Sequence, residues 1–426
     1  MSQIREFKNE TLHEKYYEIT HDSGLKILLL PKENFKSTYA VFGTRYGSID
    51  TEFRLAGEKE FIAVPEGIAH YLEHKLFESE DLDAFQRYAK TGANANAYTT
   101  FDKTCYLFSC SGQFQDSLHI LLDFVTHPYF TPETVQKEQG IIGQEIKMTA
   151  DNPDWETLFL LLRALYQKHP VRIDIAGTVE SISHITADLL YTCYNTFYNL
   201  SNMVLCVAGN ATPEEILKVC DADMKPQAPK QIERKFFEEP DEVFTPYIEK
   251  HLSVASPMFS LGFKESIKTP ERSLKEIILS NMLLELIAGE TSAFYNELLE
   301  EGLLNTSFYS EYFFGYGYAS SLFFGESPNP KEVQKRITER ILSLQKDGIA
   351  EKDFKRIQKK FYGRAVMQFN DIESLANGMV SSYFCNEGPF DELKIIESLR
   401  LSDLLERLQK AFCVEHSALA VILPEE

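Results

Sequence analysis

The sequence predicts an α+β fold made of two homologous α/β domains, each a mixed sheet packed by helices. Three observations predict it. A chain of 426 residues is longer than one hydrophobic core usually supports, and it suits two domains of about 200 residues each. Segments with strand character alternate with segments of helical period along the chain. The two halves also end in similar stretches of sequence, which indicates a duplication.

The alternation of strands and helices is clearest in the first half of the chain. Strand-like segments place β-branched and aromatic residues between turn signals, at residues 25–31, 37–47, 95–110 and 202–210. Helical segments repeat apolar residues every three or four positions, at residues 65–79, 114–127, 131–150 and 185–198. Two of them carry a proline where a helix would begin. This order of elements is typical of an α/β unit.

The duplication is visible at the ends of the two halves. In each half the letters Asp-Leu-Leu precede a phenylalanine and an apolar strand: 187–190, Phe197 and 202–207 in the first, 402–405, Phe412 and 417–422 in the second. Each pair has the same offset, for example 403 − 188 = 215 positions. A repeated unit explains a constant offset of half the chain. We therefore predict an N-terminal domain 1–225, a linker 226–242 rich in proline and charge, and a C-terminal domain 243–426.

Composition excludes several classes of function. The 43 Lys and Arg residues against 64 Asp and Glu give a net charge of −21, which argues against a nucleic-acid partner because phosphate surfaces select clustered positive charge. No apolar run approaches the roughly 18 residues of a membrane span, and the polar N-terminus resembles no secretory signal. Seven scattered cysteines indicate reduced thiols. We expect a cytoplasmic protein.

The most specific motif is His70-Tyr71-Leu72-Glu73-His74 within a predicted helix. Side chains four residues apart lie on one face of a helix, so both histidines can reach the same ion. Glu73 lies beside them, where it can contact a water on that ion. This HxxEH order is the inverse of the HExxH motif of common zinc peptidases. The alternative is a coincidental pair of surface histidines.

A third ligand is predicted in the helix of residues 131–150. Glu138 and Glu145 are seven residues apart, which is two helical turns, and they share a stripe with apolar residues. Burying two carboxylates there requires a cation or hydrogen bonds. The alternative is that this stripe is exposed to solvent. Two histidines and one glutamate with an open fourth position have the form of a catalytic zinc site, and such a site predicts hydrolysis of peptide bonds with a glutamate as the base.

At these residues the chain resembles the M16 family of metallopeptidases, which includes pitrilysin, insulin-degrading enzyme and the mitochondrial processing peptidase. The resemblance covers nearly the whole chain and includes the stretches HYLEH, GANANAYTTFDKTCY, EQGIIGQEI with DNP, HPVRIDIAGTVESISHIT and NLSNMVLCVAGN. The combination is highly specific. The length is similar to that of the bacterial two-chain type, M16B.

The resemblance implies a fold and a set of site residues. The fold would be two α/β roll domains of the LuxS/M16 metallopeptidase type, each with a sheet rich in antiparallel pairs. One Zn²⁺ per chain would be bound by His70, His74 and Glu145. Glu73 would be the catalytic base, and Glu138 would support a ligand without binding zinc itself. The activity would be that of a metalloendopeptidase acting on short unfolded peptides.

The resemblance also implies partners. Relatives bind an extended peptide substrate along an edge strand, which maps here to Asn94, Ala95, Asn96, Ala97 and Tyr98. Two homologous chains close as a clamshell, so we expect a homologous M16 subunit as partner, in a heterodimer or alternatively a homodimer.

One departure from the family concerns the second half. Many relatives have an Arg and a Tyr there that hold substrate, where this chain has Leu299 and Asn305. Tyr309 or Tyr312 could substitute for the Tyr, but no Arg is near in sequence. We therefore expect the partner subunit to supply these groups. The alternative function is a non-catalytic scaffold or peptide-binding subunit, accessory to a modification pathway such as that of elongation factor P.

Overall fold

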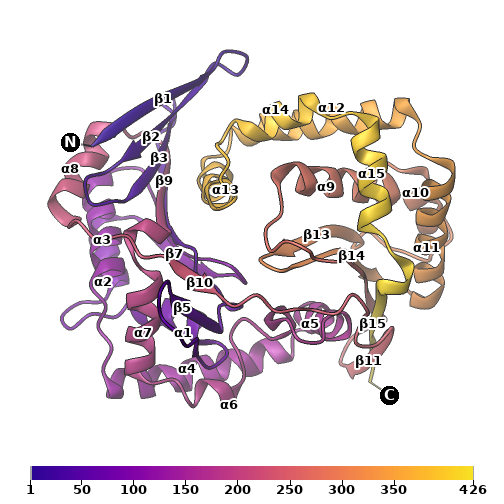
Figure 1. The fold of residues 1–426 in the computed structure, drawn as a ribbon, viewed down its shortest axis with the longest axis horizontal. Coiled ribbons are helices and arrows are strands. Elements are labelled where there is room, and N and C mark those ends of the chain that lie inside the picture. Colours follow the sequence, from indigo (N-terminus) through magenta and orange to yellow (C-terminus); the bar gives the residue numbers. More distant parts are fainter. Residues whose placement is uncertain (1, 426) are drawn as a thin grey trace. The chain divides into compact units, whose positions relative to one another are not determined.

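The computed structural model describes residues 2–425, and the chain forms two compact units (Figure 1). Unit 1 contains the residues up to 146 together with 174–235 and 366–390, whereas unit 2 contains 147–173, 236–365 and the residues from 391 onward. Neither unit is therefore a continuous piece of sequence.

Unit 1 is built on a seven-stranded sheet in the order β1-β2-β3-β9-β4-β8-β7. β3 and β9 run parallel, and the other neighbouring pairs run antiparallel. β4 and β9 are buried at every position, because helices cover both faces of the sheet. The strands are β1 (Gln3–Asn9), β2 (Glu14–Thr20), β3 (Lys26–Pro31), β4 (Thr38–Thr44), β7 (Asn94–Thr99), β8 (Thr104–Cys110) and β9 (Met203–Gly209).

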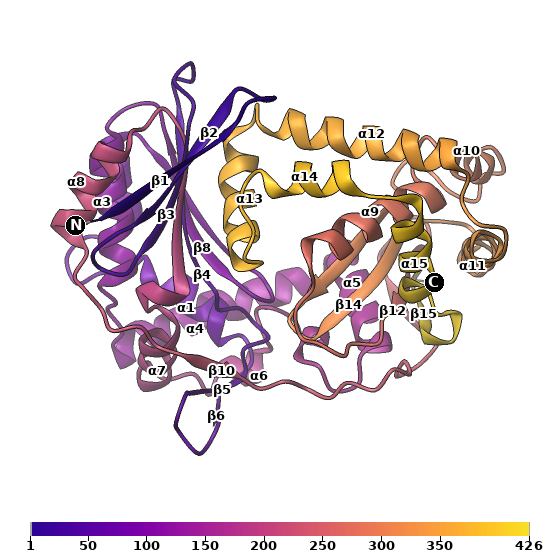
Figure 2. The same cartoon turned by 45° about the horizontal axis from the view of Figure 1, so that its top comes forward.

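The helices of unit 1 lie on the two faces of this sheet. One face carries most of them, and α13 packs on the other face, against β4 and β9 (Figures 1 and 2). Gly43 permits this close packing, since a Cβ there would lie 2.9 Å from the side chain of Val380. The helices are α1 (Ile68–Leu76), α2 (Ala84–Thr91), α3 (Phe114–Thr126), α4 (Pro132–Ala150), α6 (Val179–Ile182), α7 (Ala187–Phe197), α8 (Pro213–Asp223), α13 (Ile372–Phe384) and the 3-10 turn Leu200–Asn202.

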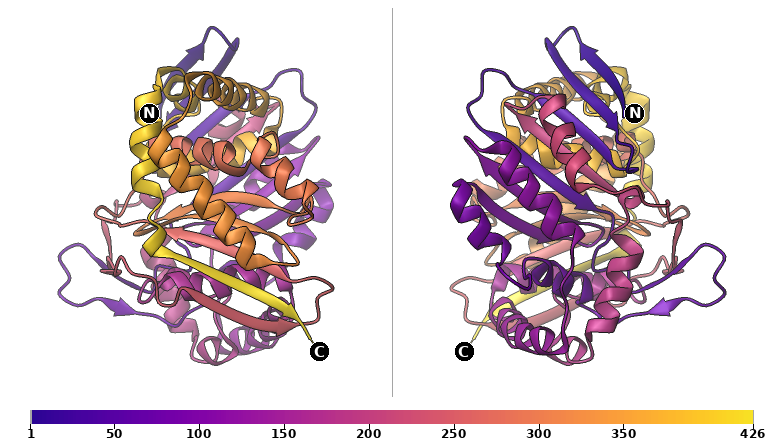
Figure 3. Two further views of the ribbon diagram at one scale, coloured as in Figure 1. Left: turned by 90° about the vertical axis from the view of Figure 1, so that its right-hand side faces the viewer. Right: turned by 90° about the vertical axis from the view of Figure 1, so that its left-hand side faces the viewer.

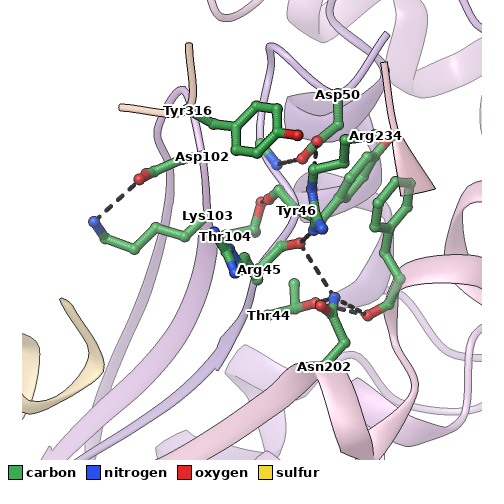
Figure 4. A network of polar contacts seen from close by, with 12 residues as sticks. Thr44, Arg45, Tyr46, Asp50, Asp102, Lys103, Thr104, Asn202, Arg234 and Tyr316 are labelled. Atoms are coloured by element: carbon green, nitrogen blue, oxygen red, sulfur yellow. Dashed lines mark hydrogen bonds and ion pairs between the residues drawn. The ribbon is translucent and has the colours of Figure 1, made fainter. Parts of the chain in front are cut away.

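A small sheet in the order β10-β5-β6 ties the predicted linker to unit 1. β10 (Ile232–Arg234) pairs with β5 (Glu52–Leu55), which pairs with β6 (Ile62–Ala63). Arg234 Nε donates to Asp50 Oδ1 at 2.8 Å, and the Gly47 amide donates to Asp50 Oδ2 at 2.9 Å (Figure 4). Burial raises the pKa of Asp50, while the charge of Arg234 opposes that rise. Part of the linker is therefore an ordered strand held by a buried ion pair.

Unit 2 is built on a five-stranded sheet in the order β11-β15-β12-β14-β13. β11 and β15 run side by side and parallel (Figure 3), and the other neighbouring pairs are antiparallel. The strands are β11 (Tyr247–Leu252), β12 (Met258–Lys264), β13 (Tyr309–Gly315), β14 (Tyr318–Glu326) and β15 (Ser417–Pro424).

Helices also cover both faces of the sheet in unit 2. α5 packs against β11, β12 and β15, and it comes close to β12 because Gly262 has no side chain to collide with Leu161 and Leu165. α9 and α15 pack together, and α9 also contacts β13. The helices are α5 (Pro153–Leu165), α9 (Leu274–Ala288), α10 (Ala293–Glu300), α11 (Pro330–Asp347), α12 (Glu351–Gln368), α14 (Asp391–Ser398), α15 (Leu401–Ala411) and the 3-10 turns Pro170–Arg172 and Val414–His416.

The two sheets share one topology, which confirms the predicted fold class. The order β3-β9-β4-β8-β7 in unit 1 and β11-β15-β12-β14-β13 in unit 2 have the same strand directions, with one parallel pair at the same place. β7 begins at Asn94 and β13 at Tyr309, an offset of 309 − 94 = 215 residues.

The compact units nevertheless differ from the predicted segments 1–225 and 243–426. α5 belongs to the first half of the sequence but packs in unit 2, and α13 belongs to the second half but packs in unit 1. Each half of the sequence has a helix at this point, and each of the two helices packs on the sheet formed mainly by the other half of the sequence. The predicted domain boundaries stay a prediction about the repeated halves.

A buried ion pair connects the layers of unit 2. Arg407 on α15 donates from Nη1 to Glu265 Oε2 at 2.9 Å, and it also donates to Tyr312 Oη at 2.8 Å and to Ser280 Oγ at 2.8 Å. Tyr312 is 3% exposed. The expectation that no Arg lies near Tyr312 holds only along the sequence, because α15 brings Arg407 to it from 95 residues away. This Arg–Tyr pair is part of the core.

Among residues 2–425, no single helix is long and apolar enough to cross a membrane, and one bent pair, α9 with α10, meets that test by length and composition alone.

Candidate metal centre

The helix that carries the histidine motif begins at Ile68, three residues after Pro65. Its start is fixed by two glycines with positive φ, Gly67 at 85° and Gly177 at 74°. A Cβ on Gly67 would lie 2.3 Å from the carbonyl oxygen of Ala176, so only glycine allows the two backbones to approach. Close contact with the 174–181 segment thus sets the position of α1.

One side of α1 anchors it in the core of unit 1. Ile68, Tyr71, Leu72 and Leu76 are each at most 3% exposed, and burying a side chain of this size stabilises the fold by about 1.5–3 kcal/mol. Tyr71 Oη also donates to the carbonyl of Val135 on α4. This contact joins the two helices that carry the predicted ligands.

His70, His74 and Glu145 come together on these two helices. One ligand atom from each lies within 4.8 Å of the others. His70 Nε2 is 3.6 Å from Glu145 Oε1, and His74 Nε2 is 3.5 Å from Glu145 Oε2. Both separations exceed the usual range of an N–H···O hydrogen bond. The three side chains therefore converge at ion-pair distance rather than in direct contact.

The donor set fits a zinc ion. Zn²⁺ binds His nitrogen and carboxylate oxygen at about 2.0–2.2 Å in a tetrahedral arrangement, which places neighbouring donor atoms about 3.3–3.5 Å apart. The separations of 3.5 and 3.6 Å are close to that value. Three protein ligands leave one position for water or substrate, which is the arrangement of catalytic rather than structural zinc sites.

Glu138 holds His74 in the orientation that ligation needs. His74 Nδ1 lies 3.0 Å from Glu138 Oε1, and Glu138 is 7% exposed. Because a carboxylate only accepts hydrogen bonds, Nδ1 carries the proton and the lone pair of Nε2 is directed to the metal position. The two glutamates of the stripe therefore differ in position: Glu145 offers a carboxylate oxygen to the candidate cluster, and Glu138 is hydrogen-bonded to His74.

Burial controls the charge of the motif. Burial, reinforced by the charge of His74, lowers the pKa of His70 to about 3, so His70 is neutral near pH 7, as a ligand must be. Burial pulls the pKa of His74 down, but the hydrogen bond to Glu138 and nearby carboxylates outweigh it, and the pKa is raised. Burial also raises the pKa of Glu73, which Thr99 and His74 oppose. A raised pKa brings a carboxylate closer to the range of a general base.

Thr99, which no sequence motif indicated, contacts the candidate site through Glu73. Its Oγ1 donates to Glu73 Oε2 at 2.5 Å and lies 3.3 Å from Thr104 Oγ1. Thr104 in turn donates to the Tyr46 carbonyl at 2.9 Å (Figure 4). The alternation of side chains along the strand could have indicated that Thr99 faces inward. Thr99 shares a face of β7 with Ala95 and Ala97, and those two alanines pack against the core.

The predicted substrate strand, β7, is an outer strand of the seven-stranded sheet and pairs only with β8. Asn94 and Asn96 are exposed, whereas Ala95 and Ala97 are partly buried. The Tyr98 hydroxyl donates to Asn377 Oδ1 on α13 at 2.7 Å, so any substrate contact of Tyr98 would use its backbone. The last residue of β7, Thr99, is hydrogen-bonded to Glu73, so the edge of β7 ends next to the candidate site.

The chain belongs to peptidase family M16, whose members include proteins named zinc proteases. Residues 64–179 match the family described as Insulinase (Peptidase family M16), and residues 184–361 match the family described as Peptidase M16 inactive domain. The metal motif lies in the first match, and the second covers most of unit 2.

Two relatives resemble the chain along nearly its whole length. The "Uncharacterized zinc protease YmfH" of Bacillus subtilis (strain 168) is 40% identical over 427 residues, covering 99% of this chain and 100% of its own. The crystal structure of an M16-like peptidase from Alicyclobacillus acidocaldarius is 36% identical with a TM-score of 0.92, covering 98% of this chain and 100% of its own.

Pitrilysin shares the fold at lower identity. It is 16% identical with a TM-score of 0.77, and the match covers 99% of this chain and 47% of pitrilysin. This chain thus corresponds in fold to about half of pitrilysin.

Proposed function

We propose that the protein is a zinc-dependent endopeptidase that cleaves short unfolded peptides with one zinc ion per chain. The observation that carries the proposal is that donor atoms of His70, His74 and Glu145 lie close enough to one another to share one ion. The carboxylate of Glu73 is near enough to interact electrostatically with His74 and Glu145. The names of the relatives, several of which are called zinc proteases, support the same metal.

The roles of the residues follow from their positions. His70, His74 and Glu145 would hold the ion, which when bound acts as a Lewis acid on the scissile carbonyl and on water. Glu73 accepts a proton from the attacking water at Oε1, since Oε2 is occupied by the hydroxyl of Thr99. Glu73 then delivers that proton to the leaving amine. Peptide backbone would pair with the open edge of β7 along Asn94–Tyr98, which gives affinity with little sequence preference.

Cleavage of a mixed pool of 10–30-residue peptides, read by mass spectrometry, tests the activity. We expect products with the zinc-loaded chain and none with Glu73→Gln. Zinc content measured on both proteins is the matched control, because Glu73→Gln leaves the three ligands in place. Equal cleavage by both proteins would contradict the role of Glu73.

We further propose that a homologous M16 subunit completes the enzyme. The family resemblance implies an Arg and a Tyr where this chain has Leu299 and Asn305. In the structure the Asn305 amide donates to Glu326 Oε2 within unit 2. Activity that rises on adding the homologous chain, and that depends on dilution, would support the heterodimer. Equal activity with and without it would contradict the proposal.

The second candidate is a peptide-binding subunit without catalysis. The match of residues 184–361 to the inactive domain of the family favours it for the second half of the chain. It predicts that Glu73→Gln binds peptides as tightly as the wild type does and that neither protein cleaves them.

A further inference from the structure

Unit 2 contains a cavity of about 680 Å³ far in sequence from the metal motif. It lies where the ends of four helices meet: the last turn of α9, the first turn of α10, the C-terminal part of α11 and the start of α12. Its volume falls within the roughly 300–1,000 Å³ of small-molecule sites. The proposed peptidase chemistry uses none of the lining residues.

The cavity concentrates positive charge in an acidic chain. Arg340, Arg356 and Lys360 line it, against Asp353 as the single lining carboxylate, although the whole chain has a net charge of −21. Lys360 is neutralised by an ion pair with Glu285. Among the described residues, no carboxylate lies within ion-pair distance of either arginine. The lining therefore keeps two uncompensated guanidinium groups.

Arg340 supplies an unsatisfied donor. Its Nε is buried and has no hydrogen-bond partner, which is unfavourable because a buried donor loses its bonds to water. Arg356 Nη1 donates only to a neutral group, Thr291 Oγ1, at 3.2 Å. An anion in the cavity would satisfy Arg340 and replace a weak partner of Arg356 by a charged one.

Backbone and apolar groups of the lining also favour an anion with an apolar body. Ser292 and Ala293 at the start of α10 and Ala350 at the start of α12 border the cavity, and helix N-termini carry free amides and partial positive charge. Leu344 and Ile349 contribute buried apolar surface to the same wall. The lining thus combines oxyanion donors with an apolar surface.

We propose that this cavity binds a small organic anion, a carboxylate or phosphate group carried on an apolar body, with Arg340 and Arg356 as its main ligands. The inference stands independently of the proposed peptidase function, because the site lies in unit 2 and shares no residue with the metal centre.

Calorimetric titration of the full-length chain with phenyl phosphate and with phenylacetate tests the proposal, and inorganic phosphate measures the contribution of the apolar body. We expect saturable 1:1 binding of at least one aromatic anion, and weaker binding of inorganic phosphate. Arg340→Gln should lower the affinity for the aromatic anion by about tenfold or more, since a charge-assisted hydrogen bond is lost. Lys346→Gln removes an exposed charge from the same helix and should change the affinity by less than about twofold.

A second control separates this cavity from the metal centre, because zinc also attracts anions. His74→Ala removes a candidate ligand and should leave the aromatic anion bound with the wild-type affinity. Binding lost in His74→Ala but kept in Arg340→Gln would assign the anion to the metal centre and overturn the proposal. Absence of saturable binding of both aromatic anions to the wild type would overturn it equally. Preference for phosphate or for carboxylate would identify the head group.

Discussion

The hydroxyl of Thr99 lies 2.5 Å from Oε2 of Glu73 and donates a hydrogen bond to it. This bond reaches from the end of strand β7 to helix α1, so the strand proposed to bind substrate also orients the proposed base. Glu73 is left with one carboxylate oxygen to accept a proton.

Thr99→Val tests this orientation, because it replaces the hydroxyl by a methyl group of similar size. We expect kcat to fall by roughly 10- to 100-fold, corresponding to the loss of a hydrogen bond to a carboxylate, with KM and zinc content nearly unchanged. Thr99→Ser restores the donor and should recover most of kcat. A parallel loss in Thr99→Ser would indicate that the methyl group, and hence packing, is what matters.

Glu145→Gln should remove most of the bound zinc, because a neutral amide is a poor ligand in place of a carboxylate. We expect the zinc content after dialysis, measured by elemental mass spectrometry, to fall from about one per chain to below about 0.1. Glu133→Gln is the control, since Glu133 is exposed on the first turn of the same helix. Retention of zinc by Glu145→Gln would exclude Glu145 as a ligand.

Glu138→Ala should weaken zinc binding without removing a ligand, because His74 then loses the partner that fixes its Nε2 towards the metal. Losses of this kind are about 10- to 100-fold in metal affinity. Glu138→Gln keeps an acceptor for His74 Nδ1 and should lie between Glu138→Ala and the wild type. Competition with a chelator of known affinity measures all three. Equal affinities would assign Glu138 no part in the centre.

Gly67→Ala should destabilise the protein more than Gly57→Ala does. Both glycines have positive φ, 85° for Gly67 and 94° for Gly57. A Cβ on Gly67 would collide with the carbonyl of Ala176, whereas a Cβ on Gly57 would have no heavy atom within 4 Å. We expect about 1 kcal/mol for Gly57→Ala from φ alone and several kcal/mol for Gly67→Ala. Denaturant unfolding followed by circular dichroism compares them. Similar losses would show that the approach of the two backbones is not strained by a methyl group.

His169 should make unit 2 less stable in acid. Burial lowers its pKa to about 4, although the Tyr316 carbonyl at Nε2 opposes the shift. In the unfolded chain the pKa of this histidine is about 6.5, so between pH 6.5 and 4 the unfolded chain binds more protons than the folded chain. The contribution of neutral His169 to the free energy of unfolding is therefore complete above pH 6.5 and is lost as the pH falls. At pH 5 the loss is about 2 kcal/mol.

Urea unfolding at pH 7.5 and pH 5, followed by the fluorescence of Trp155 in unit 2, measures this effect. The single Trp makes the signal specific to one unit. Between the two pH values, the free energy of unfolding of His169→Gln should fall by about 2 kcal/mol less than that of the wild type. His127→Gln, at an exposed position, should lose as much as the wild type. The same pH dependence in all three proteins would contradict the prediction.

The residues that meet in the candidate cluster could be selected from the sequence, because their spacing is local information. The spacing of His70 and His74 on one helix and of Glu138 and Glu145 on another determines which side chains share a face. Spacing alone left open which glutamate is the better candidate ligand. In the structure Glu138 lies at hydrogen-bond distance from His74 Nδ1, whereas Glu145 lies near the Nε2 atoms of both histidines, and we propose Glu145 as the ligand on that ground. Thr99 was missed because its role depends on a contact between two elements.

The fold class was also predictable, whereas the packing partners of α5 and α13 were not. An apolar helical stripe shows that a helix is buried but not which sheet covers it. The pairing of Arg407 with Tyr312 had no local signal either, because the two lie on α15 and β13, 95 residues apart.

The place of α13 in unit 1 has a consequence for synthesis of the chain. Ribosomes make the N-terminal part first. Strands β4 and β9 of that part are covered by α13 only when residues 372–384 have emerged. A nascent chain that has passed the 226–242 segment therefore still exposes one apolar face of that sheet. Expression of the first half alone should yield an aggregating fragment, and the zinc-binding form should arise only near the end of translation.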